Sequence, residues 1–512
     1  MQIDRRTILA GGAALAAMPG AARGATDPIA WGPGGRWQGL REASVSVFRG
    51  IRYGVDPGTY RFQPPRAPIA SHDVQRAIAF GPTCPQRGTG PDRAEDCLFL
   101  NVWTPEARPG ARRPVMVYFH GGAYSGGTVV EPLVFGNRLA AAGDVVVVTV
   151  NHRLNALGYL YLARLDPRFA DSGNVGQLDL VLALRWVRDN IAGFGGDPTR
   201  VMVFGQSGGG AKIATLMAMP AARGLFHAAA TMSGQQVTGS GPINATRRAE
   251  AFLARLKATP AQAATLPVER LIDALGAEDP ILGGGVYMGP VVDMRSLTRH
   301  PFWPDAHPLG ATIPLILGNT REETRAFIAP DGPVLRGIDW SNIAARLAPQ
   351  LRIDVHPEWL VAQYRQHFPA MTPADLLYAA STAGRSWPGQ VIEAEARATA
   401  GVPAWVYQLD YSSPLRPGGG AAHTDDIPLV FGTLDTPGSV SGTGADARTV
   451  SARMMAAFVA LARSGNPGAD WPRHTLPRRA TMIFDRVSRV ADDPRRWERE
   501  LFAQFPYVQP GT

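Results

Sequence analysis

The sequence contains very little cysteine and lysine. Cys84 and Cys97 are the only cysteines in 512 residues, and they do not form the CxxC spacing of redox pairs and zinc sites. Lys212 and Lys257 are the only lysines among 51 basic residues, and the arginines are spread along the chain. The net charge of +8 therefore indicates an arginine-rich surface, because nucleic-acid binding needs clustered positive charge.

Repeats, low-complexity linkers and metal-ligand motifs are also lacking. No internal repeat is visible, no Gly/Ser- or Pro-rich stretch separates domains, and no HExxH or comparable ligand set occurs. With 45 % hydrophobic side chains the chain can bury a large core. We therefore expect residues 25–512 to form one domain without metal or cofactor.

Residues 1–24 have the pattern of an export signal. Arg5 and Arg6 precede a weakly apolar Ala/Gly stretch, which is followed by small residues suited to cleavage near Ala22 or Gly24. The stretch is shorter than the roughly 20 apolar residues of a membrane span. We expect a twin-arginine signal and a periplasmic or secreted protein, the alternative being a frayed N-terminal helix of a cytosolic protein.

The compartment decides how the two cysteines are interpreted. Twelve residues lie between Cys84 and Cys97. In an exported protein a disulfide between them would close a small loop and contribute at most about 3 kcal/mol. In a cytosolic protein they would be two ordinary thiols.

Short β-rich runs alternate with helical segments along the chain. Segment 180–194 has apolar residues at helical spacing, whereas two stretches, 245–280 and 335–400, are rich in helix formers and poor in strands. Continuous apolar strands between helices predict an α/β fold whose mostly parallel sheet is covered on both faces, with the two stretches as helical excursions near one edge. The strand-like runs are 115–119, 145–150, 201–204, 313–317 and 405–409.

Ser207 is the candidate nucleophile. It lies in GQSGG, between the apolar run 201–204 and helix-forming sequence, which is the context that gives the GxSxG pattern its meaning. A sharp strand-to-helix turn exposes the hydroxyl, and side chains at Gly205 and Gly209 would collide across it. A glycine-rich turn without chemistry is the alternative.

A serine needs a base, and the base needs an acid to orient it. His423 lies in a glycine-rich loop just after the run 405–409, where an imidazole can reach the sheet edge. Glu323 follows the run 313–317 and precedes His423, which gives the chain order serine, acid, histidine. Its neighbour Glu322 is a rival, and solvated loop side chains are the alternative for all three.

The segment FHGGAYSGG follows the run 115–119. Its residues Gly122 and Ala123 can bring backbone N–H groups to a developing oxyanion, and Gly208 supplies a third donor. A plain turn is the alternative interpretation.

From about residue 34 to residue 507 the chain resembles the type-B carboxylesterase and cholinesterase family of the α/β-hydrolase fold. Many segments occur in the family's order, which is more specific than any one of them. They are FRGIRYG, RFQPPRAP, AEDCLFLNVWTP, FHGGAYSGG, NHRLNALGYL, SGNVGQLDLVLALRWVRDNIAGFGGDPTRVMVFGQSGGG, GPVVD, LGNTREET, GAAHTDDIPLVFG, SGNP and TMIFD.

The resemblance implies a role for each candidate. Ser207 would be the nucleophile, His423 the base and Glu323 the acid, which family sequences place after another acidic residue. It also implies supporting features: oxyanion donors Gly122, Ala123 and Gly208, triad support from Ser233, a Cys84–Cys97 disulfide, and structural ion pairs Arg61–Glu95 and Arg153–Asp179.

Two departures from the cholinesterases restrict the expected substrate. Gln206 stands where they have glutamate, and the segment between the two cysteines lacks the aromatic residue that binds choline there. We therefore expect a serine esterase that acts on small uncharged esters through an acyl-enzyme, as a monomer or homodimer. The alternatives are an amidase or carbamate hydrolase with the same triad, and a non-catalytic adhesion module, which the intact triad argues against.

Overall fold

The computed structural model describes residues 27–90, 92–385 and 387–511. The expected export signal, residues 1–24, lies outside these residues. Among the helices of the described ranges, none has the length and hydrophobicity that crossing a membrane requires.

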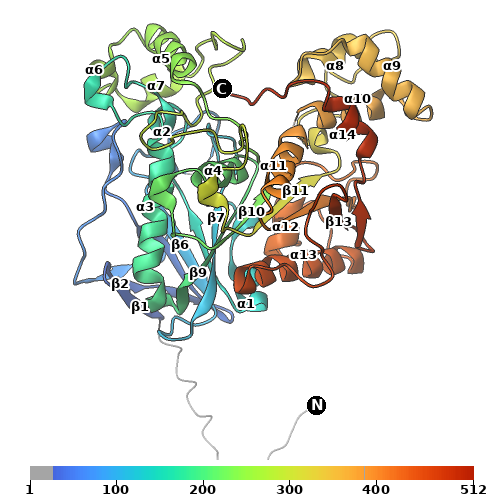
Figure 1. The fold of residues 1–512 in the computed structure, drawn as a ribbon. Coiled ribbons are helices and arrows are strands. Elements are labelled where there is room, and N and C mark those ends of the chain that lie inside the picture. Colours follow the sequence, from blue (N-terminus) through green and yellow to red (C-terminus); the bar gives the residue numbers. More distant parts are fainter. Residues whose placement is uncertain (1–26, 91, 386, 512) are drawn as a thin grey trace, which may run out of the picture.

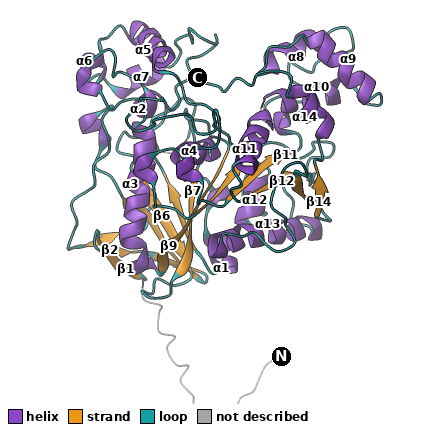
Figure 2. Ribbon diagram, viewed as in Figure 1, coloured by secondary structure: helices purple, strands orange, loops and turns teal. Residues whose placement is uncertain are grey.

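An eleven-stranded sheet runs through the middle of the molecule, with helices on both sides of it (Figure 2). The pairing is parallel from β8 through β13 and antiparallel at both edges. This confirms the expected mostly parallel sheet. In spatial order the strands are β14 (Arg489–Asp492), β13 (Ala480–Phe484), β12 (Ala404–Leu409), β11 (Leu315–Thr320), β10 (Ala228–Met232), β9 (Gly196–Gln206), β7 (Arg113–Phe119), β8 (Val146–Val150), β6 (Phe99–Thr104), β4 (Val45–Arg52) and β3 (Leu40–Glu42).

Each of the five strand-like runs overlaps a strand of this sheet. The run 313–317 is displaced, because β11 begins at Leu315 and continues to Thr320. Pro314 has no N–H to donate to a neighbouring strand, so the ladder begins after it. A second, three-stranded sheet consists of β1 (Ile29–Gly32), β2 (Gly35–Gln38) and β5 (Val74–Arg76).

The helices separate into two layers and two excursions (Figure 1). On one face of the sheet lie α2 (Asn155–Tyr159), α3 (Val175–Asn190), α4 (Gly208–Leu216) and α11 (Trp387–Thr399), and on the other α1 (Asn137–Gly143), α12 (Asp426–Phe431) and α13 (Ala445–Ser464). The expected excursion 245–280 is confirmed as α5 (Pro242–Leu256), α6 (Pro260–Ala263) and α7 (Val268–Ala274). The excursion 335–400 is confirmed for α8 (Ile343–Leu347), α9 (Pro357–His367) and α10 (Pro373–Arg385), but its last part, α11, packs on the central sheet against β11 and β12.

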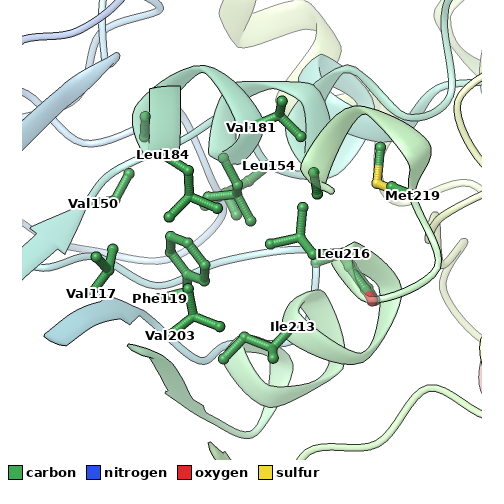
Figure 3. Packing of buried hydrophobic residues seen from close by; sticks show 14 of the residues in the cluster. Val117, Phe119, Val150, Leu154, Val181, Leu184, Val203, Ile213, Leu216 and Met219 are labelled. Atoms are coloured by element: carbon green, nitrogen blue, oxygen red, sulfur yellow. The ribbon is translucent and has the colours of Figure 1, made fainter. Parts of the chain in front are cut away.

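Strand β7 shows how the sheet divides the core. Its alternate residues Val117 and Phe119 join one cluster with Ile213 and Leu216 of α4 (Figure 3), whereas Met116 belongs to the cluster on the opposite face. Successive side chains of a strand point to opposite faces, so one apolar run fills both layers. A third cluster holds together α8, α9, α10 and α14 (Arg496–Phe502), which we call the helical lobe.

Candidate active site

Ser207 lies at the turn from β9 into α4, where its backbone has φ 55° and ψ −124°. An L-residue pays a steric cost in this conformation, and such strain is typical of exposed nucleophiles. The Ser207 N–H donates to the Met232 carbonyl at 2.7 Å and so ties the turn to β10. The sequence prediction of a strand-to-helix turn at Ser207 is confirmed.

The glycines around Ser207 are required by backbone contacts. A Cβ at Gly205 would lie 2.6 Å from the Gly209 carbonyl carbon, and a Cβ at Gly209 would lie 2.0 Å from the Phe119 oxygen. Both distances are far below van der Waals contact, and the atoms met are backbone that cannot move aside. Strand β9, helix α4 and strand β7 approach so closely only because these side chains are absent.

Glu323 and Glu322 have different surroundings. The Glu323 carboxylate is fully buried and accepts a hydrogen bond from His423 Nδ1. Glu322 is half-buried and forms an ion pair with Arg325 at 3.0 Å. Of the two rivals, the structure therefore brings Glu323 to the histidine.

Three other groups hold the Glu323 carboxylate. Its Oε1 accepts hydrogen bonds from the Ser233 hydroxyl at 2.6 Å, the Thr320 N–H at 2.7 Å and the Asn319 amide at 3.1 Å. Burial alone would raise the pKa of Glu323, but His423 and these donors outweigh it and leave the pKa below its usual value. Glu323 is thus held as a carboxylate, with Ser233 in contact with it as the resemblance implied.

His423 connects Glu323 to the nucleophile turn. Since its Nδ1–H donates to Glu323, its Nε2 carries the lone pair, and this nitrogen lies 3.2 Å from the side-chain amide nitrogen of Gln206. Gln206 immediately precedes Ser207. Among the described residues the Ser207 hydroxyl makes no hydrogen bond, so in this conformation Gln206 occupies the histidine's accepting position.

Gly122, Ala123 and Gly208 lie together beside Ser207. A Cβ at Gly208 would lie 2.2 Å from the Ala123 oxygen, and one at Gly121 would lie 3.3 Å from the Ser207 Cβ. Gly122 and Ala123 have φ of 82° and 53°, which turns the loop at this point. Within the described residues the N–H groups of Gly122, Ala123 and Gly208 donate no hydrogen bond, so they remain free to bind an oxyanion.

Lys212 lies beneath this loop, a position that the sequence reasoning did not assign. It is fully buried on α4 and donates to the Ala123 carbonyl at 2.8 Å and to the His120 carbonyl at 3.1 Å. Burial lowers the pKa of Lys212 to about 7. The available signal was a lysine one turn after the nucleophile in a chain with two lysines.

A second buried acid lies behind His423. Asp426, on α12, accepts a hydrogen bond from the Tyr407 hydroxyl at 2.7 Å. Burial, together with the charge of Glu323, raises the pKa of Asp426 to about 7. Its place in HTDD, three residues after the histidine, was the only sequence signal.

Cys84 and Cys97 are both free and buried, so the expected disulfide is not formed in this structure. A hydrogen bond with the Cys84 thiol and burial raise the pKa of Cys97 well above its usual value. The two expected ion pairs are present, Arg61 with Glu95 and Arg153 with Asp179, the latter at 2.7 Å. Over the described ranges, no three His, Cys, Asp or Glu side chains gather in a way that would hold a metal ion.

The sequence model of the carboxylesterase family matches residues 29–496. The chain belongs to the carboxylesterase family. It is 34 % identical over 495 residues to the para-nitrobenzyl esterase of Bacillus subtilis, which covers 91 % of this chain and 96 % of that one. It is also 32 % identical over 474 residues to the fumonisin B1 esterase of Sphingopyxis macrogoltabida, covering 84 % and 82 % of the two chains.

Solved structures of the family confirm the fold. A carboxylesterase from Geobacillus stearothermophilus superposes with a TM-score of 0.81 at 33 % identity, covering 93 % of this chain and 99 % of that one. The expected α/β-hydrolase fold is therefore confirmed, and the protein is a carboxylesterase-type hydrolase.

Proposed function

We propose that Ser207, His423 and Glu323 form the catalytic triad of this esterase, and that it hydrolyses carboxylic esters through an acyl-enzyme. The observation that carries the proposal is the buried His423–Glu323 hydrogen bond beside the strained turn that presents Ser207. The proposed substrates are uncharged esters, because Gln206 replaces an acid and segment 85–96 has no aromatic residue to bind a cation.

In the first step the Ser207 Oγ attacks the ester carbonyl carbon while His423 Nε2 accepts the hydroxyl proton. The carbonyl electron pair moves to oxygen, and the N–H groups of Gly122, Ala123 and Gly208 stabilise that charge. The ester C–O bond then breaks, and His423 gives its proton to the departing alcohol.

In the second step water attacks the acyl-Ser207 carbonyl and gives a proton to His423. Collapse of this intermediate releases the carboxylic acid, and Ser207 regains its proton. Glu323 stays ionised throughout and stabilises the imidazolium that forms twice. The Gln206 amide must leave His423 Nε2 before each proton transfer, since it occupies the same lone pair.

The test is hydrolysis of p-nitrophenyl acetate, butyrate and octanoate by the purified chain, beside Ser207→Ala. Loss of activity by about 10⁴-fold or more in a folded Ser207→Ala variant supports the proposal. Equal activity of the two proteins on all three esters would refute it. Matched anilides in the same assay separate an esterase from an amidase.

We also propose that residues 1–24 export a catalytic unit formed by residues 25–512. The support is the Arg5–Arg6 pair ahead of the short Ala/Gly stretch. Replacing both arginines by lysine should leave the protein in the cytoplasm of its host, as measured by fractionation. Unchanged export would refute a twin-arginine route.

A further inference from the structure

Two half-buried arginines near the site have no acceptor. Arg352 and the last residue of α10, Arg385, form no ion pair and no side-chain hydrogen bond with any described residue, and the Arg352 Nε is completely buried without a partner. Other buried arginines have acceptors: Arg153 pairs with Asp179, and Arg397 donates to the carbonyls of Gly310 and Pro403. A buried donor without an acceptor is costly, so the Arg352 Nε–H needs an explanation.

Arg385 adjoins the histidine side of the active site. Its guanidinium carbon lies 4.9 Å from the centroid of the Phe327 ring, and that ring lies 4.9 Å from the imidazole of His423. Phe327 is 49 % exposed, so it lies at the surface of the site. Arg385 is therefore one aromatic ring away from the catalytic base.

Arg352 lies beside the C-terminal segment, whose Gly511 packs against the ring of Tyr287. Burial raises the pKa of Tyr287, and the nearby charge of Arg352 opposes this rise. The Tyr287 ring in turn contacts Tyr124 of the oxyanion loop, at 6.5 Å between centroids. The Arg352 carbonyl accepts from the N–H of Val508, in the C-terminal segment that runs from α14 toward α5–α7 (Figure 1).

The two arginines are neighbours in the fold, because the Arg352 N–H donates to the carbonyl of Gly384, the residue before Arg385, at 2.8 Å. Burial and then the charge of Arg352 lower the pKa of Arg385. The buried acid Glu393 on α11 carries little negative charge at neutral pH, because burial raises its pKa to about 8. Glu323 is already paired with His423. The pair thus places positive charge beside Phe327, without an ion-pair partner in the described chain.

We propose that Arg352 and Arg385 form a subsite for a carboxylate carried by the ester substrate. This inference rests on the proposed function and extends its substrate class from uncharged esters to acid-bearing esters, such as half-esters of dicarboxylic acids. Two guanidinium groups offer the planar, charge-assisted donors that a carboxylate accepts best. The acid is bound on either the acyl or the alcohol part, and the two parts are tested separately.

The experiment compares isosteric acids and amides. Monomethyl adipate against methyl 5-carbamoylpentanoate tests the acyl part, and 4-acetoxybenzoate against 4-acetoxybenzamide tests the alcohol part. In at least one pair we expect kcat/KM to be about tenfold or more higher for the acid, through a lower KM. The preference should disappear in Arg352→Gln and Arg385→Gln, and Arg385→Lys should restore part of it.

Two controls separate this inference from the proposed function. Hydrolysis of p-nitrophenyl butyrate should change by less than about threefold in the arginine variants, because that ester carries no acid. Arg365→Gln removes an exposed charge from α9 of the same lobe and should leave every ratio unchanged.

Acid-to-amide ratios that are the same in the wild type and the double variant would overturn the subsite while leaving the esterase proposal intact. If no ester is hydrolysed at all, the esterase proposal fails. The subsite is then judged by whether adipate raises the Tm of the wild type but not of the double variant.

Discussion

Charged side chains at the carboxyl ends of the central strands, which we call the sheet edge, have hydrogen-bond partners among the described residues. Those at Arg352 and Arg385, which we call the rim of the helical lobe, do not. At the sheet edge the Glu323 carboxylate accepts four hydrogen bonds and the Lys212 ammonium donates two. At the rim, Arg352 and Arg385 have no acceptor within the described chain. The difference separates the proposed catalytic site, whose charged groups are hydrogen-bonded within the chain, from a surface whose proposed role requires a ligand.

The largest effect, on kcat, should come from replacing Glu323. Glu323→Gln keeps the shape but removes the charge that orients and stabilises His423, so kcat on p-nitrophenyl butyrate should fall by about 10⁴-fold. Glu322→Gln, one residue away and paired with Arg325, should change kcat by less than about twofold. Similar losses in both variants would show that neither glutamate alone serves the histidine.

A smaller effect is expected from adding a side chain at Gly209, where the turn at Ser207 leaves no room for one. Gly209→Ala places a methyl group against the Phe119 carbonyl, so β7 and α4 must separate, at a cost of about 3 kcal/mol in the free energy of unfolding. Urea unfolding measures it. At Gly285 an added methyl group meets nothing within 4 Å, and Gly285→Ala should be nearly neutral. Equal stability of the two variants would contradict the close approach.

Destabilising the helical lobe should leave the hydrolysis of a small ester nearly unchanged. Leu360→Ala opens a cavity in its buried cluster and should cost about 3 kcal/mol, whereas the same change at Leu415, which is 66 % exposed, should cost little. We expect hydrogen exchange of α8–α10 to accelerate and the acid-ester preference to weaken. Hydrolysis of p-nitrophenyl acetate should change by less than about threefold. A large loss with acetate would mean that lobe and sheet edge act as one unit.

The effect that is smallest within a single pH unit is the pH dependence of stability at Lys212. Its folded pKa of about 7 lies below the unfolded value of 10.5, so between these values the unfolded chain binds more protons. Stability from this group is therefore lowest below pH 7 and rises up to pH 10.5, by about 1 kcal/mol per pH unit. Lys212→Met should remove that slope in urea unfolding, and Lys257→Met, at the exposed lysine, should keep it. An unchanged slope in Lys212→Met would contradict the lowered pKa.

The positions of Ser207, Glu323 and His423 were predictable from the sequence, whereas the environment of Arg352 and Arg385 was not. The strands that carry Ser207, Glu323 and His423 are short apolar runs followed by polar residues, and parallel strands bring those ends together. The choice of Glu323 over Glu322 needed the family pattern, because adjacent residues in a loop have no periodicity to distinguish them.

Charges whose environment depends on distant segments escaped the sequence reasoning. Lys212 is buried because residues 120–123 cover it, and Arg385 contacts Phe327 because α10 ends beside that ring. The same limit applies to the cysteines, whose spacing suits a disulfide but does not determine their oxidation state.

The burial of Lys212 also has a practical consequence for attaching the protein to a support or a dye. With no solvent exposure, its amine is closed to acylating reagents while the fold is intact, whereas Lys257, at the end of α5, is exposed. Amine-directed conjugation of the folded protein should therefore occur at one lysine side chain, besides the α-amino group, and should yield molecules with a nearly uniform orientation.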